Sequence, residues 1–278
     1  MRESIYEIES SQIGLRREGP PPHASETLVD LHCHCLPGFD DGPESYGQAV
    51  ALCRMLTQHN IHTVIATPHQ LGRFEGRTAP DDIRIAVWRL NRRLGDEDIN
   101  LTVFPGAEVR IDERISELLA EDAILTLADM HRHILLELPY EIFIDIEPLI
   151  LQLRSEGIDS IIAHPERNIP LLGHQRILRR WLTCGVSLQA TAGSLRGDFG
   201  PQAEDIGWAW MAEGWVTVVA TDTHGRRHES LRMIETFEQI EARFGHDLAR
   251  LLCVDNPSRV LRGERLMPPH FPGRQEVW

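Results

Sequence analysis

The segment "VDLHCHCLPGFDDGP", residues 29–43, contains two histidines, two cysteines and two adjacent aspartates. Successive side chains of a strand point to opposite faces, so we expect His32 and His34 to share one face and the two cysteines to share the other with Leu31. The proline and glycine that follow end the strand, which leaves the aspartates, Asp41 among them, free to fold back. Three interpretations are open: a metal site, a redox or zinc–thiolate site, and a polar strand.

Ionisable residues also follow most of the other apolar runs, each at the carboxyl end of an expected strand. These are His69 in "IATPH", Glu108 in "FPGAE", Glu137 in "LLELP", His164 and Arg167 in "IIAHPER", and Asp222 and His224 in "VVATDTH". In a parallel barrel those ends meet on one face, where the active sites of such folds form. A single histidine after a strand is usually structural, but coincidence is a poor explanation for six strands out of seven.

The candidate metal ligands are His32, His34, Asp41, His69, Glu108, Glu137, His164, Asp222 and His224. Nine groups are too many for one transition-metal ion, which takes about four to six ligands, so two or three ions are implied. Nitrogen and oxygen donors without thiolate suit manganese, iron or zinc. Clustered divalent ions supply hydroxide near neutral pH and bind the oxygens of a phosphate ester, so the pattern predicts phosphoester hydrolysis.

The elements that must position these residues alternate along the chain. Strands are expected near 28–34, 62–67, 100–105, 133–138, 158–163, 186–190 and 216–221. Helices are expected near 44–58, 80–94, 111–120, 145–156, 174–183, 202–213 and 229–242, with one or two closing helices over 246–262. Repeated strand–helix units predict an α/β fold with a parallel sheet, either open or closed into a barrel.

Composition limits the function classes. The net charge of −14 argues against binding to nucleic acid or to an anionic membrane surface. All 28 basic residues are arginine, which excludes lysine-based covalent chemistry. Five cysteines without a C-x-x-C pair favour a reducing compartment, and no run reaches transmembrane length, so we expect a cytoplasmic protein without membrane insertion. We expect a flexible leader over 1–27, a single domain over 28–262 and a tail over 263–278.

These motifs resemble the polymerase-and-histidinol-phosphatase (PHP) superfamily, and within it the capsule-locus tyrosine phosphatases of the CpsB, CapC and YwqE type. The shared motifs are "DLHCHCLPGFDDGP", "IATPH", "GAEV", "LLELP", "IIAHPER", "QATAGSL", "ATDTHG" and "DNPSRVL", which cover about residues 28–262. The resemblance implies a distorted (β/α)7 barrel with three metal ions. It also implies a manganese-dependent protein-tyrosine phosphatase that acts on a bacterial tyrosine kinase of capsule or exopolysaccharide biosynthesis.

The resemblance also implies roles for individual residues. One ion would be held by His32, His34, Glu108 and Asp222, a second by Glu108, Glu137 and His164, and a third by Asp41, His69 and His224. Catalytic roles would fall to Arg167, Asp41 and His224, and substrate contacts to Arg167, Arg226 and Arg227. Two departures concern the phosphate pocket: Thr191 replaces the usual asparagine of "QATAGSL", and the arginine expected about five residues beyond His224 is absent, with Arg226 and Arg227 closer.

Other interpretations stay open from the sequence. The stretch "CVDNPSR", Cys253 to Arg259, matches the cysteine-phosphatase pattern C-x5-R, although its aspartate and proline suit an anion-binding loop poorly. A group of tryptophans, Trp208, Trp210 and Trp215, suits core packing better than ligand stacking. Within the superfamily, the alternative is a histidinol-phosphate phosphatase or another small-molecule phosphoesterase. A catalytically silent partner of an export kinase and a homo-oligomer are also compatible with the sequence.

Overall fold

The structure is a computed structural model, and it describes residues 26–225 and 233–270. Most of the expected leader and the end of the expected tail lie outside the described residues. Arg226 and Arg227 lie outside them as well. The described part of the chain contains no helix that is both long and apolar enough to cross a membrane.

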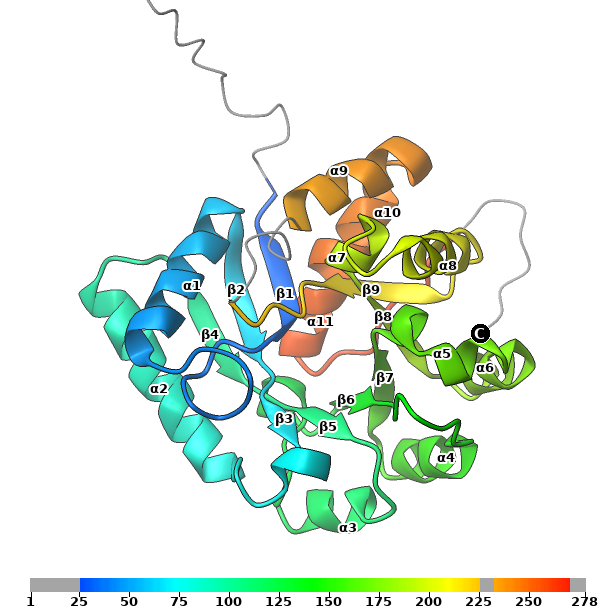
Figure 1. The fold of residues 1–278 in the computed structure, drawn as a ribbon, viewed down its shortest axis with the longest axis horizontal. Coiled ribbons are helices and arrows are strands. Elements are labelled where there is room, and N and C mark those ends of the chain that lie inside the picture. Colours follow the sequence, from blue (N-terminus) through cyan, green and yellow to red (C-terminus); the bar gives the residue numbers. More distant parts are fainter. Residues whose placement is uncertain (1–25, 226–232, 271–278) are drawn as a thin grey trace, which may run out of the picture.

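Parallel strands occupy the centre of the molecule, and helices surround them (Figure 1). The first sheet has the order β1 (Leu28–Cys33), β2 (Ile61–Ala66) and β4 (Thr102–Pro105). The second sheet has the order β3 (His69–Gln70), β5 (Glu108–Arg110), β6 (His133–Glu137), β7 (Asp159–Ala163), β8 (Ser187–Thr191) and β9 (Val216–Ala220). All seven expected strands are present, and the two short strands β3 and β5 were not expected.

The strands of the distorted β/α barrel pair in two separate sheets, and the chain crosses between these sheets three times, from β2 to β3, from β3 to β4 and from β4 to β5. Strand β3 continues the path of β2 after two residues, and β5 continues the path of β4. An isolated parallel bridge between Cys33 and Thr223 then links the end of β1 to the segment after β9. The break between β4 and β5 requires Gly106, where an added Cβ would lie 2.6 Å from Cγ2 of Ile65.

Helices follow the strands much as expected. The helices that match the seven expected between residues 44 and 242 are α1 (Tyr46–Gln58), α2 (Pro80–Asp96), α3 (Ile115–Ala120), α4 (Glu147–Ser155), α6 (Gln175–Thr183), α8 (Pro201–Ala212) and α9 (Met233–Phe244). Short ones are α5 (Ile169–Leu172), α7 (Ala192–Leu195), α10 (His246–Arg250), α11 (Asn256–Leu261), η1 (Gly72–Phe74), η2 (Leu127–Asp129), η3 (Pro165–Arg167) and the π-helical η5 (Leu251–Asp255). In α2, a proline and two aspartates in the first turn favour its start.

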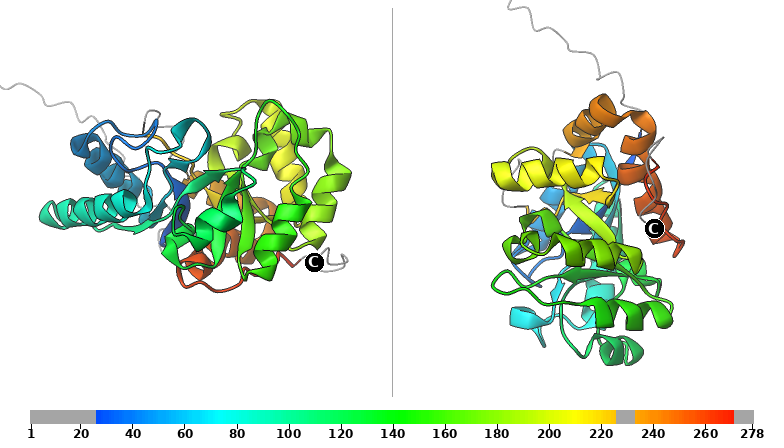
Figure 2. Two further views of the ribbon diagram at one scale, coloured as in Figure 1. Left: turned by 90° about the horizontal axis from the view of Figure 1, so that it is seen from below. Right: turned by 90° about the vertical axis from the view of Figure 1, so that its right-hand side faces the viewer.

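The hydrophobic core has two parts, one inside the barrel and one between the strands and the surrounding helices. The inner cluster combines side chains from several strands, such as Ile65, Leu135 and Val218, with Val260 of α11. Figure 2 shows α11, in red, on one side of the strands. Because this cluster fills the barrel and α11 covers one end, the polar residues at the carboxyl ends of the strands gather at the other end.

Strand β1 differs from the expected alternation. Asp30 pairs with Val64 and Cys33 with Ala66, so β1 has one residue more than β2 over this stretch. Leu31 belongs to the inner cluster, whereas Cys33 and Cys35 pack in the outer one. The prediction that the cysteines share a face with Leu31 is therefore wrong, because an extra residue in one strand reverses the alternation beyond it. Both cysteines are fully buried in apolar surroundings, which disfavours the redox or zinc–thiolate interpretation.

Candidate metal centre

The structure brings all nine predicted ligands together at the carboxyl ends of the strands. Three overlapping groups have ligand atoms within 4.8 Å of one another: His34, Asp41, His69 and His224; His32, Glu108, His164 and Asp222; and His69, Glu108 and Glu137. The strands β1, β3, β5 and β6 carry five of these residues within their bounds or just beyond, and the others follow β1, β7 and β9. Whether each residue binds a metal ion stays a prediction.

Four ligand atoms from His32, His34, Glu108 and Asp222 lie at similar distances from one another. Nε2 of His32 lies 3.2 Å from Nε2 of His34, 3.3 Å from Oε2 of Glu108 and 3.2 Å from Oδ1 of Asp222. Nε2 of His34 lies 3.5 Å from the same Glu108 oxygen and 3.4 Å from the same Asp222 oxygen. These distances are those expected between donor atoms that share one metal ion with bonds of about 2 Å.

Glu108 belongs to two of the three groups, and His69 links one of these two to the third group. Oε1 of Glu108 lies 2.7 Å from Nε2 of His164, and its Oε2 lies 3.0 Å from Nδ1 of His69. Among the described residues, the fully buried Oε2 has no hydrogen-bond partner. Burial would raise the pKa of Glu108, but His32 and His164 hold that pKa well below its usual range. A buried, ionised acceptor without a hydrogen bond needs a positive charge nearby, and a divalent cation fits this position.

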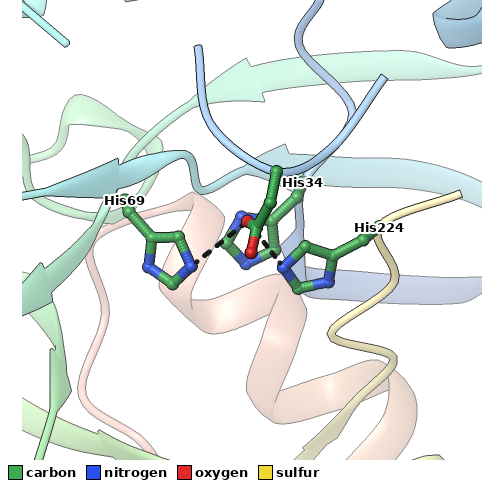
Figure 3. Close-up of side chains that lie close together, drawn as sticks. His34, His69 and His224 are labelled. Carbon is green, nitrogen blue, oxygen red and sulfur yellow. Dashed lines mark ion pairs between the residues drawn. The ribbon is translucent and has the colours of Figure 1, made fainter. Parts of the chain in front are cut away.

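The remaining group lies closer to solvent. Oδ1 of Asp41 is 3.3 Å from Nε2 of His224 and 3.6 Å from Nε2 of His69, and it too has no hydrogen-bond partner in the described part of the chain. Figure 3 shows the imidazoles of His34, His69 and His224 converging from three segments. The rings of His34 and His224 are stacked with centroids 3.9 Å apart. These donors could hold a further ion at the outer side of the centre.

The three groups of neighbouring ligand atoms contain the same nine residues as the expected assignment to three ions. The two schemes divide these residues differently. His34 lies close to Asp41 and His224 as well as to His32, and His164 lies close to the His32 group. Because His34, His69 and Glu108 lie between neighbouring groups, each could serve either side. The assignment of each residue to a particular ion therefore stays a prediction.

The outer ring nitrogens of the histidines are held by partners that the sequence analysis missed. His32 Nδ1 donates to Oε1 of Gln189 at 2.8 Å, and His34 Nδ1 donates to Oδ2 of Asp40 at 2.7 Å. The hydroxyl of Tyr140 pairs with Nδ1 of His164 at 3.3 Å. Such bonds fix the ring orientation and leave Nε2 directed at the centre, as in known metal sites. Gln189 lies on β8, the expected strand to which the sequence analysis assigned no ligand.

Arg167, at the end of η3, joins the ligand cluster. Its guanidinium is largely buried and donates to Oδ2 of Asp222, and its Nε has no hydrogen-bond partner among the described residues. Arg167 does not form a surface ion pair with its neighbour Glu166, because Glu166 is itself buried and accepts the backbone N–H of Thr191 at 3.0 Å. Arg167 and burial also lower the pKa of His164, burial more strongly, to about 4, which keeps that imidazole neutral.

Two other interpretations do not fit the structure. Cys253 lies fully buried in η5, where burial raises the pKa of its thiol, so it is unsuited to act as a thiolate nucleophile. The tryptophans Trp208, Trp210 and Trp215 are all buried, which agrees with core packing. Of the predicted substrate-binding arginines, Arg167 is at the site, whereas Arg226 and Arg227 lie outside the described residues.

Replacing Gln189 should weaken metal binding. In Gln189→Leu, His32 loses the acceptor that orients its ring, so affinity for divalent ions should fall about 10- to 100-fold. Gln189→Glu keeps an acceptor oxygen and should bind metal far more tightly than the leucine variant. Competition with a chromogenic chelator measures the affinity, and Gln58→Leu, at the exposed end of α1, is the matched control. Unchanged affinity in a folded Gln189→Leu protein would show that Gln189 does not orient the centre.

Comparison with known proteins places this centre in a family. The model of the capsular polysaccharide synthesis family CpsB/CapC matches residues 28–262. The tyrosine-protein phosphatase YwqE of Bacillus subtilis is 32% identical over 254 residues, which cover 90% of this chain and 99% of YwqE. The putative tyrosine-protein phosphatase CapC of Staphylococcus aureus is 28% identical, over 90% of this chain and 98% of CapC.

The comparison with solved structures agrees with the comparison of sequences. A crystal structure from work on YwqE of Bacillus subtilis and CpsB of Streptococcus pneumoniae, described there as metal-dependent tyrosine phosphatases, matches with a TM-score of 0.82 and 32% identity. It covers 87% of this chain and 97% of that one. A histidinol phosphate phosphatase from Lactococcus lactis, at 14% identity and a TM-score of 0.50 over 77% of this chain and 93% of that one, shares the fold alone. The chain thus belongs to the CpsB/CapC family.

Proposed function

We propose that this protein is a metal-dependent protein-tyrosine phosphatase that hydrolyses phosphotyrosine on a bacterial kinase of capsule or exopolysaccharide biosynthesis. The observation that carries the proposal is the cluster of nine residues with nitrogen or oxygen donors, Glu108 among them, with the guanidinium of Arg167 beside it. The names of the relatives YwqE and CapC, which match nearly the full length of this chain, support the choice of phosphotyrosine.

The donor set suits two or three divalent ions, with Mn²⁺ proposed and iron or zinc as alternatives. Bound there, such ions lower the pKa of coordinated water and neutralise charge on the phosphate. Arg167 would bind two phosphate oxygens and stabilise the charge that develops during transfer. The contact with His224 lowers the pKa of Asp41, so this carboxylate stays ionised and suits cation binding better than proton donation. We therefore propose that Asp41 and His224 contribute to catalysis by holding the ion at the outer side of the centre.

A cytoplasmic location and a kinase partner form part of the proposal. All five cysteines are free thiols, which is typical of a reducing compartment. The complete set of ligands favours an enzyme over a catalytically silent partner of the kinase. A small-molecule phosphatase has the same metal chemistry, so substrate comparison must separate the two functions.

Metal removal and a substrate comparison test the function. Exhaustive chelation should abolish hydrolysis of a phosphotyrosine peptide, and added Mn²⁺ should restore it, because the phosphate is held and attacked at the metal centre. Hydrolysis of the peptide should exceed that of histidinol phosphate in kcat/KM. The Cys253→Ser variant should retain nearly full turnover. Activity that persists in the chelated protein, or that is lost in a folded Cys253→Ser variant, would exclude the metal mechanism.

Arg167→Ala should retain the fold and the metal ions but lose most turnover. Loss of a transition-state contact costs about 2 to 4 kcal/mol, which corresponds to roughly 10²- to 10³-fold in rate. Arg167→Lys should rescue only part, because lysine lacks the planar fork. Arg54→Ala removes an exposed ion pair with Glu97 and is the matched control. If steady-state kinetics gave Arg167→Ala a rate close to wild type, phosphate binding would have to be assigned to Arg226 or Arg227.

A further inference from the structure

A second feature adjoins the metal centre: a cavity of about 320 Å³ on the far side of Arg167. Its apolar and aromatic lining residues are Tyr140, Ile169, Leu172, Phe199 and Ala203, and its polar ones are Arg167, the buried Glu166 and Gln202. Ile169 is 70% exposed, Phe199 44% and Tyr140 43%, although each is a large apolar or aromatic residue. Large apolar side chains exposed around one hollow are typical of a binding site for an apolar group.

Arg167 connects this cavity to the metal centre. One part of its guanidinium donates to Asp222 of the ligand cluster, while its Cζ lies 4.3 Å from the centre of the Phe199 ring. Tyr140 forms the adjoining wall, and its ring is stacked with that of His164 at an interplanar angle of 16°. A phosphate bound to Arg167 at the metal centre would therefore lie close to the rings of Tyr140 and Phe199, within reach of its ester group.

A second cavity on the other side of the centre is a poorer place for an apolar group. It is lined in part by Arg73, Phe74, Arg110 and Glu137. Its arginines already form ion pairs, Arg73 with Asp41 at 2.8 Å and Arg110 with Glu137 at 3.3 Å. An apolar ring entering there would bury charged groups, which is costly. The charged lining suits the polar backbone of a bound peptide better.

We propose that the cavity of Tyr140, Ile169 and Phe199 binds the aromatic ring of the substrate and thereby selects aryl over alkyl phosphates. The inference rests on the proposed phosphatase function and assigns its specificity to residues outside the metal centre. Aromatic side chains around a ring add contact area and favourable ring–ring geometry. The methylene group of an alkyl phosphate is too small to fill the same space, so it gains little from these walls.

The test uses two competitive inhibitors that differ in the ring, phenylphosphonate and methylphosphonate, with the manganese-loaded full chain. Phenylphosphonate should inhibit the wild type about tenfold more tightly, in keeping with the discrimination that apolar pockets achieve. Phe199→Ala and Ile169→Ala should each reduce that preference several-fold and raise KM for a phosphotyrosine peptide. Neither should change inhibition by methylphosphonate substantially. Phe74→Ala, at the second cavity, should leave the preference for phenylphosphonate intact.

The outcomes separate this inference from the proposed function. Equal weakening of both inhibitors in Phe199→Ala, with no effect in Ile169→Ala, would mean that Phe199 acts through Arg167 and would overturn the aryl site. Loss of the preference in Phe74→Ala would place the ring in the other cavity and would also overturn it. An active enzyme that shows no preference for phenylphosphonate refutes the aryl site while the phosphatase function stands. A wild-type protein that hydrolyses no phosphotyrosine refutes the function itself.

Discussion

The carboxylate of Glu108 is the group on which the rest of the centre depends. It is fully buried, it is surrounded by four imidazoles from three different segments, and one of its oxygens has no hydrogen-bond partner in the described part of the chain. A buried carboxylate is tolerated when positive charge compensates it. Every surrounding element must therefore place a nitrogen, a guanidinium or a cation site within a few ångströms of this one side chain.

The barrel satisfies that requirement through its irregularities. The extra residue in β1 lets Leu31 fill the barrel interior while His32, its neighbour in sequence, points into the centre. The break at Gly106, close to Ile65, separates β4 from β5, so that Glu108 begins a new strand between β3 and β6. In regular strands, His32 and Glu108 would have followed the alternation of the core residues and would not both face the metal centre. Departures from ideal geometry at functional positions are the expected cost of building a site.

The sequence predicted seven of the nine strands in the described part of the chain, most of the helices and the nine polar residues at the strand ends, because these features depend on local patterns of apolar and polar residues. It did not predict the roles of Gln189, Asp40 and Tyr140, since a residue that orients a ligand is recognised by its partner across the fold. It also missed the irregularity in β1, because one extra residue leaves no mark in the pattern of apolar residues. It also could not show that Arg167 pairs with Asp222, because the two residues are 55 positions apart in the chain.

Metal content measured by elemental analysis tests most directly whether Glu108 is shared between ions. Manganese-saturated wild-type protein should contain two or three ions per chain, in line with three overlapping ligand groups. Glu108→Gln keeps the size of the side chain but removes its charge, and it should lose more ions than Glu137→Gln, whose residue belongs to one group. One ion or none in the wild type, or equal losses in the two variants, would contradict a centre built around Glu108.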